Sequence, residues 1–411
     1  MKKLPLMLLL ALSVACSKNE DLELIDSETA DDIIDDQNGN DDSGNTGGST
    51  KIYGLKASSF GFNSSDATSS ILQALDSQSD TIIIDKQSSP WVVTPLNIRG
   101  LTNKVIFVEE GVVLKAKVGA YPDSNDKLFT LRECNNVTLL GYGATFSMNK
   151  SEYTSGEWRH ALAISNSQNI TIKGLTVRDS GGDGVYIAGN GTGTYSKNIV
   201  IEDIKSINNR RQGISVVSVE NLLVKNSVFT ETKGALPGAG VDIEPNTPQD
   251  RIVNVAFEKC SFTKNYHSGI ALALSFMDAT SIPVSITFRD CFLSMNHDVS
   301  NQYANTEILV SSSKENPVKG SVLFERCTVD GSKWGMLYSR KPNSAYKVTF
   351  KDCVAKNICL DNSMPPIYLE VPDYYNPSDL GGFTFENTTI IYDAAKPFFQ
   401  VRGHSTLTGV K

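Results

Sequence analysis

Short stretches of alternating apolar and polar residues recur along most of the chain. One copy, "NITIKGLTVRD" at 169–179, alternates, is interrupted by a turn residue and then alternates again. This pattern predicts two short strands joined by a tight bend. Copies return at intervals of roughly 23–40 residues, the behaviour of a repeat architecture. They lie at 103–114, 136–146, 169–179, 198–208, 221–231, 254–264, 285–295, 321–331, 347–357 and 382–392.

Another short strand is predicted between successive copies. In "GDGVYIA" at 182–188, small or polar residues precede an apolar–any–apolar run. Short strands without hairpin turns predict an all-β fold, a single-stranded right-handed parallel β-helix whose coils stack about 4.8 Å apart. The copies of this strand lie at 182–188, 211–217, 238–244, 267–273, 305–311 and 333–339.

The first coil of such a solenoid needs a cover, and residues 66–80 are the one clear amphipathic segment. Ile71, Leu72 and Leu75 have helical spacing, and Asp66 is the expected N-cap. We therefore expect an N-terminal capping helix. Asn begins several strand copies, which predicts an internal asparagine ladder at one corner.

The N-terminus has the features of an export signal. Lys2 and Lys3 precede the apolar run "LPLMLLLALSVA", which is too short to span a membrane. Cys16 follows a small residue, as in a bacterial lipobox, although Ser13 stands where Leu is usual. We expect residues 1–16 to be a lipoprotein signal with lipidation at Cys16; the alternative is ordinary signal-peptidase cleavage.

Residues 17–50 form an acidic segment with 11 acidic residues and one basic residue. A segment of this composition cannot bury enough apolar area to fold, so it predicts a disordered linker. Its start, "SKNED", resembles the export signals of Bacteroidetes-type surface lipoproteins. We expect a protein anchored by lipid at the outer membrane and facing the cell surface, with 51–411 as the β-helix domain.

The charge balance narrows the partners of the folded part. The whole chain has a net charge of −8, whereas the linker contributes −10 and the signal +2, which leaves about zero for 51–411. Nucleic acid binding needs a basic face, so we expect no such partner. An acidic polysaccharide would have to be held by local Arg and Lys. We expect a monomer.

The cysteines also follow the repeat. Cys260, Cys291, Cys327 and Cys353 occupy the same position in their copies. The matched spacing predicts a buried ladder of small apolar side chains and not a disulfide framework. The chain has no Cys-x-x-Cys pair, so we expect no zinc site.

The segment "FGFNSSDATSSILQAL" followed by these coils resembles the pectate-lyase-like right-handed β-helix superfamily of carbohydrate-active proteins. The resemblance covers nearly all of 51–411 and implies a polysaccharide or glycan as substrate. That superfamily includes lyases, hydrolases of the polygalacturonase type, epimerases and non-catalytic surface proteins, so the fold does not select a reaction. The stretch 158–245 resembles β-helix glycosidases and lyases of gut-type bacteria.

Aligning the strands on Gly184, Gly213, Gly240 and Gly269 places Asp242 and Glu244 on the outer face. Their neighbours in adjacent coils are mostly small, which predicts a recess with two carboxylates at its floor. Asp183 lies two coils away, about 9–10 Å along the solenoid. Inverting glycosidases hold two carboxyls about 6.5–9.5 Å apart, so we expect Asp183, Asp242 and Glu244 to be catalytic.

Other polar and aromatic residues reach the same face, and we expect them to bind substrate. Taken singly, Asp183 and Arg211 are typical of turns and solvated corners, whereas plain surface charges are the alternative reading of Asp242 and Glu244, which their small neighbours and the prolines disfavour. Their gathering over successive coils favours a functional site. The expected binding residues are Trp158, Arg159, His160, Tyr186, Arg211, Gln212 and His267.

Three functions compete. The first is a glycoside hydrolase without cofactor or metal. The second is a polysaccharide lyase, in which the carboxylates bind Ca²⁺ and Arg211 or His267 removes the proton; the neutral domain and the lack of Lys near the recess disfavour it. The third is a non-catalytic glycan-binding surface protein. The aromatic segment at 365–377 is expected to be a loop or C-terminal cover.

Overall fold

The computed structural model describes residues 52–297, 306–360, 364–370, 379–393, 397–402 and 406–411. The predicted signal and linker lie outside these residues. From Gly54 onward the chain forms one compact unit. Among the described residues, no helix has the length and apolar character needed to cross a membrane.

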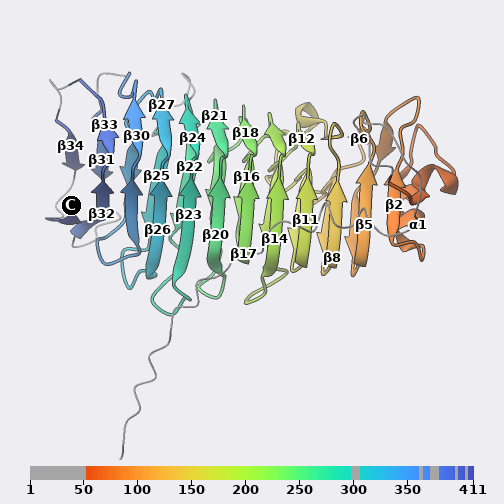
Figure 1. Cartoon of the computed structure of the whole chain (residues 1–411), viewed down its shortest axis with the longest axis horizontal. Helices are drawn as coiled ribbons and strands as arrows, with labels where there is room; N and C mark the ends of the chain where they lie inside the picture. Colours follow the sequence, from red (N-terminus) through yellow and green to blue (C-terminus); the bar gives the residue numbers. More distant parts are fainter. Residues whose placement is uncertain (1–51, 298–305, 361–363, 371–378, 394–396, 403–405) are drawn as a thin grey trace, which may run out of the picture. The chain divides into compact units, whose positions relative to one another are not determined.

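Three parallel sheets, here called A, B and C, are built from strands of successive coils (Figure 1). Sheet A contains β1 (Leu55–Lys56), β2 (Thr81–Ile84), β5 (Thr102–Val108), β8 (Asn135–Leu140), β11 (Gln168–Lys173), β14 (Ser196–Glu202), β17 (Val219–Lys225), β20 (Ile252–Glu258), β23 (Val284–Arg289), β26 (Gly320–Glu325), β29 (Lys347–Lys351), β32 (Asp379–Glu386) and β35 (Thr406–Val410).

Sheet B follows sheet A after a tight bend in each coil. It contains β3 (Trp91–Val93), β6 (Val113–Ala116), β9 (Thr145–Ser147), β12 (Thr176–Arg178), β15 (Lys205–Ile207), β18 (Val228–Thr230), β21 (Ser261–Thr263), β24 (Phe292–Ser294), β27 (Thr328–Asp330), β30 (Val354–Lys356) and β33 (Thr389–Ile390).

Sheet C lies between a B strand and the next A strand along the chain. It contains β4 (Leu96–Arg99), β7 (Phe129–Arg132), β10 (Leu162–Ser165), β13 (Val185–Ala188), β16 (Ile214–Val216), β19 (Ala239–Ile243), β22 (Ser268–Leu274), β25 (Ile308–Ser312), β28 (Leu337–Ser339), β31 (Ile367–Glu370) and β34 (Phe399–Arg402).

The predicted strand pairs and the intervening strands are thus confirmed as an all-β parallel solenoid. Helical structure is limited to α1 (Thr68–Asp76) and the 3-10 turns η2 (Ala57–Phe60) and η3 (Lys150–Glu152) within the described residues. The expectation for 365–377 was wrong in part, because Ile367–Glu370 is strand β31. Residues 371–378 lie outside the described residues.

The capping helix α1 packs beside β2 at the N-terminal end of the coils (Figure 1). Its N-cap is Ala67, not Asp66, although Oδ1 of Asp66 accepts the backbone N–H of Thr68 at 3.1 Å. Ile71 and Leu75 are buried as expected, whereas Leu72 is 37% exposed. The helix therefore covers the first coil with a narrower apolar stripe than predicted.

Side chains of equivalent positions stack through the interior. The rings of Phe257, Phe288, Phe324 and Phe350 follow one another at 4.7–5.1 Å between centroids. Each buried Phe contributes about 1.5–3 kcal/mol to folding. The predicted cysteine ladder is confirmed, because all cysteines from Cys134 onward are free and buried. This repeated packing holds successive coils in register.

Asparagines form two ladders, and the predicted internal position was wrong for the one that begins the strand copies. Asn169, Asn198, Asn221 and Asn254 hydrogen-bond to one another at 2.8–3.0 Å along a largely exposed corner. All adopt a left-handed backbone there, which Asn tolerates better than most residues. Buried asparagines such as Asn265 and Asn296, linked at 2.7 Å, instead follow the strands of sheet B, at the bend that leads to sheet C.

Candidate active site on the outer face of sheet C

The buried asparagines explain why glycines precede the strands of sheet C. A Cβ on Gly184 would lie 2.5 Å from Nδ2 of Asn209, and one on Gly240 would lie 2.8 Å from Nδ2 of Asn265. Each of these glycines thus faces the interior where no side chain fits. The residue before Gly184, Asp183, contacts Arg211 and His160 on the outer side.

Strand register then arranges the outer side chains in rows. Tyr186, Ser215, Asp242 and Ala271 are paired neighbours in β13, β16, β19 and β22 and form the first outer row. Glu244 lies in the second outer row, two residues after Asp242. The residues that precede the glycines, including Asp183, form a further row that we call the approach row. The predicted outward orientation of Asp242 and its neighbours is therefore what the register shows.

Arg211 joins the acidic residues across coils. Its Nη2 lies 2.7 Å from Oε2 of Glu244, and its Nη1 lies 3.5 Å from Oδ2 of Asp183. Its Nε lies 3.4 Å from Oε2 of Glu157. The Arg211 side chain is only 11% exposed, so these attractions act in a partly desolvated setting. One guanidinium thus lies within 3.5 Å of the carboxyl groups of three residues.

Asp242 is fixed by an amide and is fully buried. Nε2 of Gln212 donates to Oδ2 of Asp242 at 2.7 Å, and Oε1 of Gln212 accepts the backbone N–H of Ala239 at 2.7 Å. Burial raises the pKa of Asp242 well above its usual value, and the nearby Glu244 carboxylate raises it further. Both effects favour the protonated form of Asp242.

Asp183 contacts a neutral histidine. The backbone N–H of Asp183 donates to Nδ1 of His160 at 3.0 Å, so the imidazole proton is on Nε2. Burial lowers the pKa of His160 well below its usual value. Oδ2 of Asp183 lies 3.2 Å from the same Nδ1, but a neutral ring gives no ion pair. Burial raises the pKa of Asp183 to about 7, against the opposing effect of Arg211.

Asp183 and Asp242 have no exposed area, whereas the Glu244 side chain is 33% exposed. This corrects the expected recess with carboxylates open at its floor, because only Glu244 of the three reaches solvent. Burial of a carboxyl is costly unless it is protonated or paired. The raised pKa values of Asp183 and Asp242 follow from that cost.

Buried polar atoms without a hydrogen-bonding partner gather on this face. Folded proteins leave few such atoms, and clusters of them mark functional sites. Within the described residues, most of those found lie over β7–β22. They are Oγ1 of Thr130, Nε of Arg132, both carboxyl oxygens of Asp183, Nε of Arg211, Oγ of Ser215, Oδ1 of Asp242, Nδ1 of His267 and Oγ of Ser268.

The other expected binding residues differ in their placement. The ring of Tyr186 stacks on His160 at 4.4 Å with an interplanar angle of 4°. Trp158 is 48% exposed beside Glu157. Burial and the charge of Arg340 lower the pKa of His267 to about 4, so its ring is neutral at pH 7. Their roles in binding stay predictions.

Arg159 is placed differently from the expectation. Its guanidinium donates to the backbone carbonyls of Tyr121, Ser155 and Pro122 at 2.7–2.9 Å. Arg159 therefore fastens two loops together, and this placement does not favour substrate binding. The reason is local: buried carbonyls of these loops need donors, and a guanidinium supplies several.

Three further polar residues, Lys127, Thr130 and Arg132, lie on the same face and were not predicted from the sequence pattern. Lys127 precedes β7 as His160 precedes β10, and the charge of Asp183 acts on it. Lys127 contradicts the expected lack of Lys near the site. None of these residues was predicted, because "LFTLR" at 128–132 has the apolar–any–apolar pattern but no preceding Gly. Searching for the pattern without Gly would have found them.

The described residues contain no group of three or more His, Cys, Asp or Glu side chains placed to hold a metal ion. Calcium therefore stays a prediction attached to the lyase alternative.

Comparison with known proteins agrees with this architecture. A family model described as a right-handed β-helix region matches residues 129–297. The fold is a right-handed parallel β-helix. A stretch of 157 residues is 25% identical to the SPbeta prophage-derived uncharacterized protein YorA of Bacillus subtilis (strain 168). That match covers 33% of this chain and 27% of the relative, so the chain spans about a quarter of that protein.

Solved structures share the β-helix across most of the chain. The Streptococcus pneumoniae surface protein and adhesin PfbA has a TM-score of 0.57 at 13% identity, covering 87% of this chain and 99% of that one. The Yersinia enterocolitica family 28 exopolygalacturonase has 0.55 at 13%, covering 86% and 77%. The Aspergillus tubingensis endo-xylogalacturonan hydrolase has 0.52 at 14%, covering 84% and 94%. At such identities the likeness concerns the fold, and the reaction must be argued from the site.

Proposed function

We propose that this β-helix is a glycoside hydrolase, with Asp242 as the general acid and Glu244 as the carboxylate that activates water or attacks the sugar. The observation that carries the proposal is the pairing of a fully buried carboxyl, whose pKa is raised, with a partly exposed carboxyl group held by Arg211. Glycosidases need one carboxyl protonated and the other ionised. Asp183 lies 3.5 Å from Nη1 of Arg211, and its charge also raises the pKa of Asp242.

The test uses the full chain and a panel of host and plant glycans. We expect new reducing ends without the absorbance of an unsaturated uronate, and loss of this activity in Asp242→Asn and Glu244→Gln. Asp290→Asn is the matched control, because that carboxylate pairs with Arg326 at 2.8 Å away from the site. Full activity in both site variants would refute the residue assignment. Unsaturated products would indicate the lyase, and their loss with a chelator would implicate Ca²⁺.

Non-catalytic glycan binding is the second candidate, and the burial of Asp183 and Asp242 favours it. An acid catalyst must reach the glycosidic oxygen, whereas a binding surface needs no such access. Retention on glycan affinity gels without any product would support this candidate. In that case Glu244→Gln should weaken retention.

We also propose that the protein works at the cell surface as a monomer, exported by residues 1–16 and tethered through a lipid on Cys16 and the spacer 17–50. The composition of these segments supports this proposal. Labelled fatty acid should be incorporated into the wild-type chain and not into Cys16→Ser.

A further inference from the structure

The outer face of sheet C continues toward the N-terminus beyond His160. Thr130 pairs with Ala163 of β10, and Arg132 pairs with Ser165, so both lie in the same outer rows as Asp242 and Glu244. Lys127 lies in the approach row, because the Leu128 N–H bonds to the His160 carbonyl. These three residues therefore lie on one coil, and they share the outer face of sheet C with the candidate active site.

Lys127 and Arg132 are two cations of this coil, and the charge of Arg132 acts on Lys127. Within the described residues, no ion pair is formed by Lys127 or Arg132, and Nε of Arg132 is buried without a partner. Nζ of Lys127 donates only to the carbonyl of Asn125, at 2.9 Å. Arg99, one coil earlier in the same row as Arg132, instead pairs with Glu133 at 2.7 Å.

Such an arrangement is costly for the protein alone. Burial lowers the pKa of Lys127, and the positive charge of Arg132 lowers it further, against the opposing charges of Asp126, Asp123 and Asp183. The Thr130 side chain is 2% exposed, and its hydroxyl has no partner either. A partly buried lysine and a partly buried arginine with an unused hydroxyl donor beside them are stabilised when an anion accepts their hydrogen bonds.

We propose that Lys127, Thr130 and Arg132 form an anion-binding subsite for the carboxylate or sulfate group of an acidic glycan. Ala163 and Ser165 of β10 lie between this subsite and the coil of Asp183, which is two coils from β7, about 10 Å. Both side chains are small and buried, so they do not project from this face. The subsite rests on the proposed function and adds to it that the glycan substrate carries a negatively charged group.

The neutral charge of the whole domain is consistent with this subsite. A polyanion usually meets a broad basic surface, and residues 51–411 have about as many acidic as basic side chains. A local subsite needs only a few donors aimed at one substituent. The subsite therefore predicts recognition of acidic groups by position and not by a general basic field.

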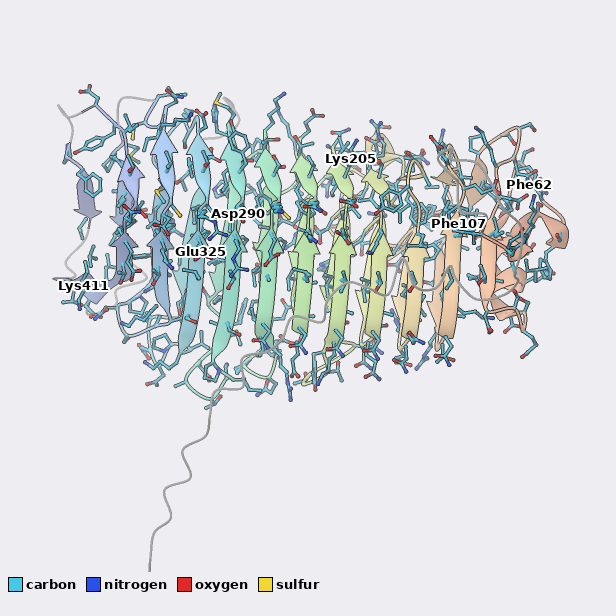
Figure 2. The ribbon with its side chains drawn as sticks, in the orientation of Figure 1. Phe62, Phe107, Lys205, Asp290, Glu325 and Lys411 are labelled. Carbon is cyan, nitrogen blue, oxygen red and sulfur yellow. The ribbon has the colours of Figure 1, made fainter. Side chains whose placement is uncertain are left out.

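The experiment measures equilibrium binding of the full chain to polygalacturonate, dextran sulfate and uncharged dextran by calorimetry. We expect Arg132→Gln and Thr130→Val to weaken binding of the acidic polymer, Arg132→Gln by about tenfold or more. Arg132→Lys should restore part of the affinity. Lys205→Gln is the matched control, since Lys205 is an exposed cation on β15 of sheet B (Figure 2). The polymer that responds distinguishes carboxylate from sulfate.

Unchanged affinity in Arg132→Gln and Thr130→Val would overturn the subsite. So would an equal loss in Lys205→Gln, or no binding of either acidic polymer by the wild-type chain. Binding does not depend on turnover, so the two proposals can fail separately. If no glycan is cleaved but acidic binding depends on Arg132, the subsite stands and the hydrolase does not.

Discussion

The outer faces of sheets A and C both carry acidic and basic side chains, but the pKa values of their carboxyl groups are shifted in opposite directions. On sheet A, Lys173 lies 3.1 Å from Glu202, and Arg289 lies 2.9 Å from Glu325. The hydrogen bond from Arg289 lowers the pKa of Glu325. On sheet C, the single guanidinium of Arg211 faces several carboxylates, and the pKa of Asp183 is raised to about 7. Glu325, labelled in Figure 2, is thus a carboxylate with a cation on each side.

The difference shows what separates a structural charge from a reactive one in a repeating fold. Both faces place acidic side chains on outward positions of parallel strands, so the backbone alone does not distinguish them. The ratio of cations to carboxylates and the depth of burial do so. A carboxyl with matched partners stays ionised, whereas one of several buried carboxyls sharing one cation retains a proton.

The largest expected effect is on catalysis. Asp242→Asn or Glu244→Gln should reduce turnover about a hundredfold to ten-thousandfold, the usual contribution of a general acid or base. Glu325→Gln on sheet A should leave turnover unchanged. The measurement is kcat from reducing-end release. Equal losses of turnover in the sheet A and sheet C variants would contradict a functional difference between the two faces.

Next in size is the pH dependence of stability. The folded pKa of Asp183 is raised from 3.8 to about 7, so the unfolded state loses its proton first as the pH rises. Stability should therefore fall between pH 4 and 7, by about 4 kcal/mol from this group. Asp183→Asn should flatten that fall in urea unfolding curves. A steeper fall in the variant would contradict the raised pKa.

A smaller effect is expected at His160. Asn can place its side-chain oxygen near the position of Nδ1 and accept the Asp183 N–H, whereas Phe keeps the ring that stacks on Tyr186 but accepts nothing. His160→Phe should lose about 1–3 kcal/mol, because it leaves a buried N–H unpaired. His160→Asn should retain more of the stability. Urea unfolding at pH 6 compares the two variants. The reverse order would show that stacking on Tyr186 contributes more to stability than accepting the hydrogen bond from the Asp183 N–H.

The smallest effect is expected on sheet A. Glu325→Gln should cost less than about 1 kcal/mol, as is usual for ion pairs near the surface. Added salt should shrink the difference further, because it screens such pairs. A loss as large as that at His160 would mean that the sheet A charges do more than maintain local pairing. Thermal unfolding at low and high salt measures this.

The fold could be predicted from the sequence because the alternation of apolar and polar residues indicates which side chains face inward. The outward placement of Asp242 and Glu244 followed from aligning glycines, and the structure explains those glycines by the asparagines beneath them. The burial of Asp183 could not be predicted, since it depends on loops whose conformation the repeat does not encode. Arg159 illustrates the same limit, because its carbonyl partners belong to two such loops.

The charges on sheet A also constrain how a solenoid of this kind can change in length. Basic and acidic residues alternate from one coil to the next along a single row. The row runs Lys173, Glu202, Lys225, Glu258, Arg289, Glu325, Lys351 and Glu386. Removing one coil would bring like charges together, whereas removing two would preserve the alternation. Within this stretch, the unit of duplication or loss that is electrostatically neutral is therefore a pair of coils.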